Sequence, residues 1–148
     1  ESLVCSRLAE HGLRPKEFLA INLRVGYYAA EHARHLEKVA TLADRLGHQF
    51  GLPVLFVPLA LNELDSDIVT AKKVVQAMRF KPAVVMEEEG LTPALVKGVM
   101  GQAFGAVGVS YHFCTFALSQ GVPAVCIHDG DYYSQKARGL SAFWQDER

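Results

Sequence analysis

The sequence has no long apolar run, almost no net charge and few cysteines. No stretch approaches the roughly 20 consecutive apolar residues that a membrane-spanning helix needs. The formal net charge is −1, so the overall charge does not favour binding to nucleic acid or to an anionic membrane. Repeats and low-complexity tracts are also missing. These absences exclude a membrane span, a strongly basic nucleic-acid-binding chain and a repeat protein.

The cysteines argue against a disulfide framework. There are three of them, Cys5, Cys114 and Cys126, an odd number at wide spacing. Cys114 and Cys126 lie in apolar segments, where a free cysteine is typically a buried thiol. We therefore expect a reducing, cytoplasmic environment. We also expect Glu1 to mark a processing boundary, because the sequence opens without a starting Met or a signal-peptide pattern.

What the sequence does contain is the composition of a globular domain. Hydrophobic residues make up 50% of the chain and charged residues 21%. A chain of 148 residues is long enough to bury one full hydrophobic core. We therefore predict a single domain over residues 1–148.

Short apolar segments alternate with helical patterns along the chain. Strands are predicted at residues 18–25, 53–60, 82–86, 105–109 and 123–127. Helices are predicted at residues 3–13, 29–50, 66–78, 92–104, 112–119 and 133–144. Strands buried on both faces read as continuous apolar runs, and these do. The alternation predicts an α/β fold with a Rossmann-like, doubly wound parallel sheet of about five strands in the order 3-2-1-4-5.

That strand order predicts where a ligand binds. Open α/β sheets hold ligands at the carboxyl edge where the strand order reverses, here between the first and fourth strands. The ends of these strands carry Arg24 and the run Ser110, Tyr111 and His112. The last three residues lead into a helix, and helix N-termini favour anions because their first N–H groups are unpaired.

A basic pair, Lys136 and Arg138, follows the fifth strand. The two residues are two positions apart, so they do not share one helical face, and we expect at most one of them to reach the site. Together with His112 and Arg24, they predict a site for a phosphate or a carboxylate. We expect Arg24, Ser110 and His112 to line one crevice, with Lys136 near its rim.

Four segments carry a resemblance to a known family. Residues 108–113, GVSYHF, followed by GVP at residues 121–123, are similar to an approximate G-x-R-x-H-A signature with a later G-V-P. Arg24 ends INLR, residues 91–108 match the helix and strand before the signature, and residues 131–140 are similar to a D-x-K element before a G-L pair. Over residues 18–140 the chain resembles the C-terminal domain of the polysaccharide pyruvyl transferase family.

The resemblance implies a function. Members of that family transfer a pyruvyl group from phosphoenolpyruvate to sugar hydroxyls as a ketal, in exopolysaccharide biosynthesis. They have two Rossmann-like domains arranged like those of B-type glycosyltransferases. The implied partners are phosphoenolpyruvate, a glycan or lipid-linked sugar acceptor, and an N-terminal domain that this sequence does not include. Neither a metal nor a cofactor is implied, and we expect the domain by itself to be inactive.

The resemblance also implies residue roles. His112 is the implied catalytic residue, because histidine gains and loses a proton near neutral pH. It would protonate the enol methylene carbon or take the proton from the acceptor hydroxyl. The implied substrate-binding residues are Arg24, Ser110, Tyr111, Lys136 and Arg138. Two features depart from the family: Ser110 stands where arginine is usual, and residues 131–136 are longer than D-x-K.

Two other function classes stay open. A glycosyltransferase domain would bind a nucleotide sugar at the same helix, with Glu89 or Asp129 on the ribose. A non-catalytic relative is favoured by Ser110. A metal site at His32 and His35, spaced i, i+3, is the weaker interpretation of what reads as a solvated helix face.

Overall fold

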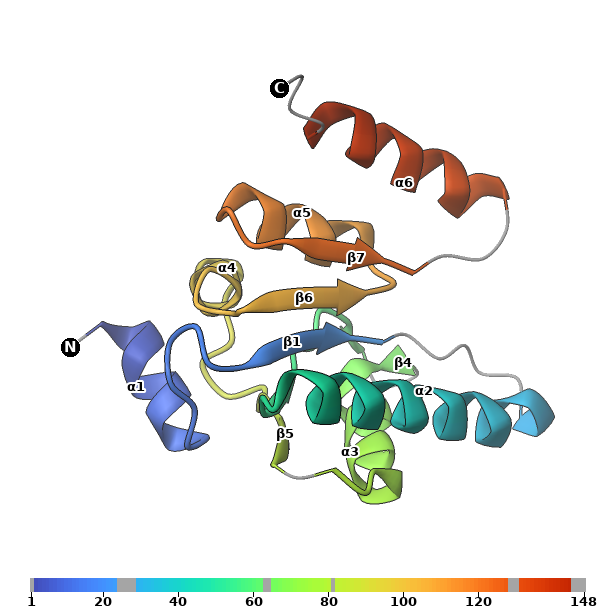
Figure 1. Ribbon diagram of the computed structural model, residues 1–148, viewed down its shortest axis with the longest axis horizontal. Coiled ribbons are helices and arrows are strands. Elements are labelled where there is room, and N and C mark those ends of the chain that lie inside the picture. Colours follow the sequence, from blue (N-terminus) through green and yellow to red (C-terminus); the bar gives the residue numbers. More distant parts are fainter. Residues whose placement is uncertain (1, 24–28, 63–64, 81, 128–130, 145–148) are drawn as a thin grey trace.

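The central feature of the molecule is a parallel sheet with helices on both faces (Figure 1). The computed structural model describes residues 2–23, 29–62, 65–80, 82–127 and 131–144. The five strands are β1 (Leu19–Asn22), β2 (Val54–Phe56), β5 (Ala83–Val85), β6 (Gly105–Gly108) and β7 (Ala124–Cys126). Their order is β5-β2-β1-β6-β7, and every neighbouring pair is parallel. The prediction of a Rossmann-like α/β fold is confirmed.

The helices form the two outer layers. One face of the sheet is covered by α2 (Ala29–Phe50) and α3 (Asp67–Ala77). The other is covered by α1 (Leu3–Glu10), α4 (Pro93–Met100) and α5 (Tyr111–Ser119). The last helix, α6 (Asp131–Trp144), packs against α5 beyond β7 (Figure 1). None of the helices in the described part of the chain has the length and apolar character that crossing a membrane requires.

Strands β1 and β2 bury side chains on both faces of the sheet. Side chains alternate along a strand, so Phe18 and Ala20 belong to the core under α4 and α5, while Ile21 and Leu23 pack toward α2 and α3. Strand β2 alternates in the same way. The continuous apolar runs in the sequence are therefore explained by a sheet with a core on each side.

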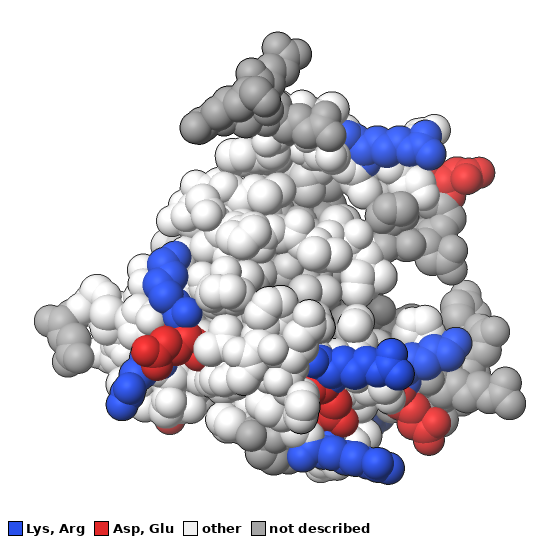
Figure 2. Space-filling model, viewed as in Figure 1, with Lys and Arg blue, Asp and Glu red and all other residues white. Residues whose placement is uncertain are grey.

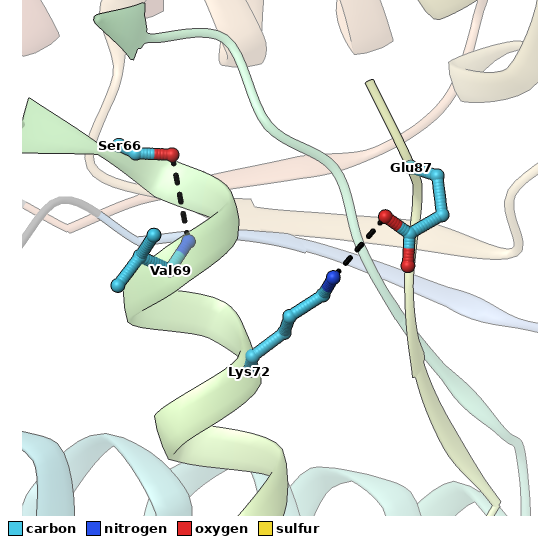
Figure 3. Close-up of polar contacts among 4 residues, drawn as sticks. All are labelled: Ser66, Val69, Lys72 and Glu87. Carbon is cyan, nitrogen blue, oxygen red and sulfur yellow. Dashed lines mark hydrogen bonds and ion pairs between the residues drawn. The ribbon is translucent and has the colours of Figure 1, made fainter. Parts of the chain in front are cut away.

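Hydroxyl caps begin two of the helices where the sequence predicts them. The Ser66 hydroxyl accepts a hydrogen bond from the Val69 N–H at 3.5 Å at the start of α3 (Figure 3). The Thr92 hydroxyl accepts one from the Leu95 N–H at 3.2 Å at the start of α4, with proline at the first helical position. Both helices therefore begin at the carboxyl edge of the sheet with part of their N–H groups satisfied.

One ion pair ties α3 to the segment after β5. The Lys72 Nζ lies 3.2 Å from Glu87 Oε2, and the two side chains face each other across the space between helix and strand end (Figure 3). Both side chains are about half exposed, so water screens the pair and its contribution to stability is small.

Two predicted boundaries are wrong. The strand predicted at residues 53–60 ends at Phe56, because the N–H groups of Leu59 and Ala60 donate to the Asp67 carboxylate and not to a neighbouring strand. The helix predicted to reach residue 104 ends at Met100, because the Phe104 N–H already donates to the Phe18 carbonyl at the entrance to β6.

An unpredicted two-stranded antiparallel ladder follows β2. It pairs β3 (Leu61–Asn62) with β4 (Asp65–Ser66). The ladder places Ser66 and Asp67 beside the carboxyl edge of the sheet, where α3 begins.

Candidate functional site

A cleft of about 400 Å³ opens at the carboxyl edge of the sheet. The end of β1, the segment after β2 and the first turns of α3, α4 and α5 border it. Its polar lining residues are Asn22, Asp67, Thr92, Ser110 and His112, and its walls are otherwise apolar. The strand order reverses between β1 and β6, so the cleft lies at the topological switch point.

Ser110 and His112 both line this cleft, at the start of α5. Ser110 is the N-cap residue, with φ −79° and ψ 126°, and its hydroxyl makes no capping hydrogen bond. His112 is the second residue of the helix and is exposed. The first N–H groups of α5 therefore lack the hydroxyl partner that α3 and α4 have, and such groups favour an anion.

A close approach between α5 and β6 places this helix end. Gly108 ends β6, and a Cβ at this position would overlap the ring of Phe113 in the first turn of α5. The Cys114 thiol lies behind the same turn, 3.8 Å from the Gly108 carbonyl oxygen. Glycine at position 108 thus lets the helix start directly over the strand end.

A buried polar pair that the sequence analysis missed also lines the cleft. Asn22 is 1% exposed and Asp67 is 5% exposed. The Asn22 Nδ2 donates to the Val57 carbonyl at 2.9 Å and to Asp67 Oδ2 at 3.1 Å. The same Oδ2 accepts the Leu59 and Ala60 N–H groups at 2.8 and 2.9 Å. Asp67 therefore holds the segment after β2 in place, and it also orients Asn22.

One signal in the sequence pointed to this pair. Asn22 is the single polar side chain in the apolar run at residues 18–23, and a polar residue in a strand buried on both faces needs partners. Asp67 carried no such signal. In the sequence it is one of several acidic residues at a helix start.

Three other predicted site residues, Tyr111, Lys136 and Arg138, do not line the cleft. Tyr111 is 38% exposed, and its ring contacts the His112 ring edge-on with centroids 5.9 Å apart. Lys136 and Arg138 lie on α6. The Lys136 Nζ sits 4.4 Å from the centroid of the Tyr132 ring. Arg138 lines a separate hollow between α5, β7 and α6.

Arg24, Ser110 and His112 were predicted to line one crevice. Arg24 lies outside the described residues, so the structure places only Ser110 and His112 in the cleft. Lys136 is not among the lining residues of the cleft, and the helix that carries it, α6, packs against α5 beyond β7. Its position near the rim stays a prediction.

Two titratable groups away from the cleft lining are shifted by burial. Burial raises the pKa of the Cys114 thiol to about 12, and the neighbouring Cys126 adds to the rise. Burial also lowers the pKa of His11, and the Arg7 guanidinium lowers it further. Cys114 is therefore a protonated thiol at neutral pH and not a nucleophile.

Charge and metal ligands are both sparse around the site. Among the residues coloured in Figure 2, Lys and Arg alternate with Asp and Glu and form no single basic patch. Across the described ranges, no group of three or more His, Cys, Asp or Glu side chains is placed to hold a metal ion. The cleft offers hydrogen-bond donors at the start of α5, a histidine that exchanges protons, and an amide oxygen at Asn22.

The resemblance to the pyruvyl transferase family is carried by the short sequence motifs alone. No protein-family model matches the chain, and no curated protein matches it.

Proposed function

We propose that the cleft binds phosphoenolpyruvate and that the chain is the donor-binding domain of a pyruvyl transferase-like enzyme. The observation that carries the proposal is the start of α5, where N–H groups without a hydroxyl cap, Ser110 and His112 meet at the switch point of the sheet. Phosphate and carboxylate are the groups that such a helix end binds.

The reaction joins two hydroxyl groups of a sugar to one carbon of the donor. The first hydroxyl oxygen bonds to C2 of phosphoenolpyruvate, and the methylene carbon takes up a proton and becomes a methyl group. The second hydroxyl oxygen then bonds to the same carbon, the C2–O bond to phosphate breaks, and phosphate leaves with the second hydroxyl proton. His112 is the candidate for moving the first proton from the hydroxyl oxygen to the methylene carbon.

Donor binding is expected to be weak in this chain by itself. The described residues that line the cleft include no Lys or Arg side chain. Ser110 occupies the position where the family resemblance implies an arginine. A hydrogen bond to a charged group contributes roughly 1.5–3 kcal/mol, so its loss weakens binding about tenfold to a hundredfold.

Calorimetry on the wild type and on Ser110→Arg tests the proposal. The substitution is expected to tighten phosphoenolpyruvate binding about tenfold to a hundredfold, because it returns one charged donor to the start of α5. Ser119→Arg is the matched control. It adds the same charge at the exposed far end of the same helix, and it should leave the affinity nearly unchanged.

Three results would contradict the proposal. Equal tightening by both variants would show a non-specific effect of net charge. Binding of a nucleotide sugar, with no binding of phosphoenolpyruvate to either chain, would favour a glycosyltransferase domain. If neither ligand binds, the non-catalytic interpretation replaces both.

The proposal extends to partners and location. The acceptor is a glycan or lipid-linked sugar, and the N-terminal domain of such an enzyme would close the cleft from the other side. A cytoplasmic location fits the free thiols of Cys5, Cys114 and Cys126.

A further inference from the structure

The amide of Asn22 has only one orientation that satisfies its neighbours. Its two partners, the Val57 carbonyl oxygen and Asp67 Oδ2, are both acceptors in these contacts. Oδ2 already accepts two backbone N–H groups, from Leu59 and Ala60. The NH₂ group of Asn22 must therefore face these acceptors, and the amide oxygen must face away from them.

The amide oxygen of Asn22 is left as an unused acceptor beside the cleft. Asn22 is 1% exposed and lines the cleft, and within the described part of the chain its buried Oδ1 has no hydrogen-bond partner. Buried polar atoms without partners are uncommon, and leaving one unmet costs free energy. A ligand that brings a hydrogen-bond donor to this oxygen removes that cost.

The surroundings of Oδ1 select the kind of donor. An anionic group is disfavoured because Oδ1 is itself an acceptor and the Asp67 carboxylate is adjacent. The Asp67 carboxylate would attract an ammonium group, but moving a charged group out of water to a buried atom costs far more than moving a hydroxyl group. A neutral hydroxyl supplies one donor and brings no charge, so it fits this position best.

The hydroxyl position lies next to the anion position. Asn22 and Gly108 are register partners in adjacent parallel strands, which lie about 4.8 Å apart. Ser110 and His112 follow Gly108 directly at the start of α5. The two positions are therefore close enough for a donor anion and a sugar hydroxyl to be held side by side.

We infer that Asn22 Oδ1 accepts a hydrogen bond from a hydroxyl group of the acceptor sugar, which binds in the same cleft as the donor. The inference rests on the proposed function for its choice of a sugar. It makes Asn22 a substrate-binding residue, with Asp67 as the residue that positions it.

NMR on the wild-type chain tests the two sites separately. In a chain uniformly labelled with carbon-13 and nitrogen-15, the side-chain carbonyl carbon of Asn22 is monitored while methyl glucoside, galactoside and mannoside are titrated in. At least one glycoside is expected to shift this resonance downfield, as a carbonyl that gains a donor does. Phosphoenolpyruvate should instead move the backbone amides of His112 and Phe113 and leave the Asn22 carbonyl in place.

A pair of variants provides the second measurement. Asn22→Leu removes the acceptor at similar volume and should weaken glycoside binding about five- to tenfold, with phosphoenolpyruvate affinity unchanged. Thr70→Val is the control, because Thr70 is also a buried polar residue but does not line the cleft. It should change neither affinity. If Asn22→Leu does not fold, as circular dichroism would show, the wild-type titration decides.

The outcomes separate the two claims. If glycosides shift Asn22 but phosphoenolpyruvate binds nowhere, the hydroxyl site stands and the proposed function fails. If phosphoenolpyruvate binds at α5 but no glycoside moves Asn22, the proposed function stands and the inference is wrong. If neither the glycosides nor phosphoenolpyruvate shift the Asn22 carbonyl resonance, Oδ1 binds neither ligand and is hydrogen-bonded by water alone. That result also overturns the inference.

Discussion

Ser110 and His112 lie two residues apart at the start of α5, but their side chains would contribute differently to a bound ligand: one to binding and the other to proton transfer. Ser110 contributes a hydroxyl and the uncapped N–H groups that follow it, which act on a bound anion whether or not a reaction takes place. His112 contributes a group that exchanges protons, which matters only while bonds change. Substitutions at the two positions should therefore act on different measured quantities.

His112→Ala should lower turnover far more than it weakens donor binding. If the proposed function holds, we expect kcat of the complete enzyme for pyruvyl transfer to fall by about 10²–10⁴, with the KM for phosphoenolpyruvate changed only slightly. The exposed His48, at the far end of α2, provides the control. His48→Ala should leave both constants unchanged, and a similar loss in the two variants would contradict the role of His112.

Cys114 should make stability fall at alkaline pH. Its pKa is raised to about 12 in the folded chain from 9.0 for an ordinary thiol, because the side chain is buried. Above pH 9.0 the unfolded chain loses this proton while the folded chain keeps it, so the free energy of unfolding falls as pH rises toward about 12.

Urea unfolding at about pH 8 and about pH 10 measures this effect. Cys114→Ala should lose less stability between the two pH values than the wild type, because it lacks the shifted thiol. Equal losses in both chains would show that other groups cause the alkaline dependence.

At the scale of elements, the junction between β6 and α5 controls the site. The helix begins directly over the strand end, because Gly108 leaves room for the Phe113 ring. Any side chain at position 108 pushes against that ring and displaces the first turn, which carries the donors of the cleft.

Gly108→Ala should therefore reduce both stability and donor binding. Overpacking of this kind costs about 1–3 kcal/mol, which urea unfolding can measure. Gly105→Ala, in the same strand, is the matched control, since its nearest contacts would be ordinary ones at 3.8 Å. A larger loss for Gly105→Ala than for Gly108→Ala would contradict the proposed junction.

The elements also show how far sequence reasoning reaches. The five strands and most helix starts follow from local patterns, because alternation and hydroxyl caps are properties of neighbouring residues. The strand order was predicted from the usual topology of this fold class and not from any local pattern. The early end of β2 did not follow. It depends on Asp67, which takes the N–H groups of residues seven and eight positions earlier in the chain.

The candidate site divides in the same way. Ser110 and His112 could be predicted, because a strand end and a helix start are adjacent in the sequence. The pairing of Asn22 with Asp67 could not, since the two residues are 45 positions apart and meet only when β1 and α3 are packed. The packing of α6, which carries Lys136, against α5 could not be predicted either, because it depends on tertiary contacts that no local pattern encodes.

At the scale of the whole molecule, the two halves of the sheet meet at the cleft. The chain builds β1, β2 and β5 outward in one direction and then β6 and β7 in the other. The site takes Asn22 and Asp67 from the first half and Ser110 and His112 from the second. Neither half has a complete site without the other.

The same strand order has a consequence for biosynthesis. The central strand β1 comes first in the chain among the strands of this sheet, but its partner β6 ends 86 positions later, at Gly108 opposite Asn22. Until then, one edge of β1 has no neighbour and its apolar side chains lack part of their cover. Non-local parallel pairing of this kind is slow and exposes intermediates to aggregation. We therefore expect the nascent chain to be most prone to aggregation in the interval between the synthesis of β1 and that of β6.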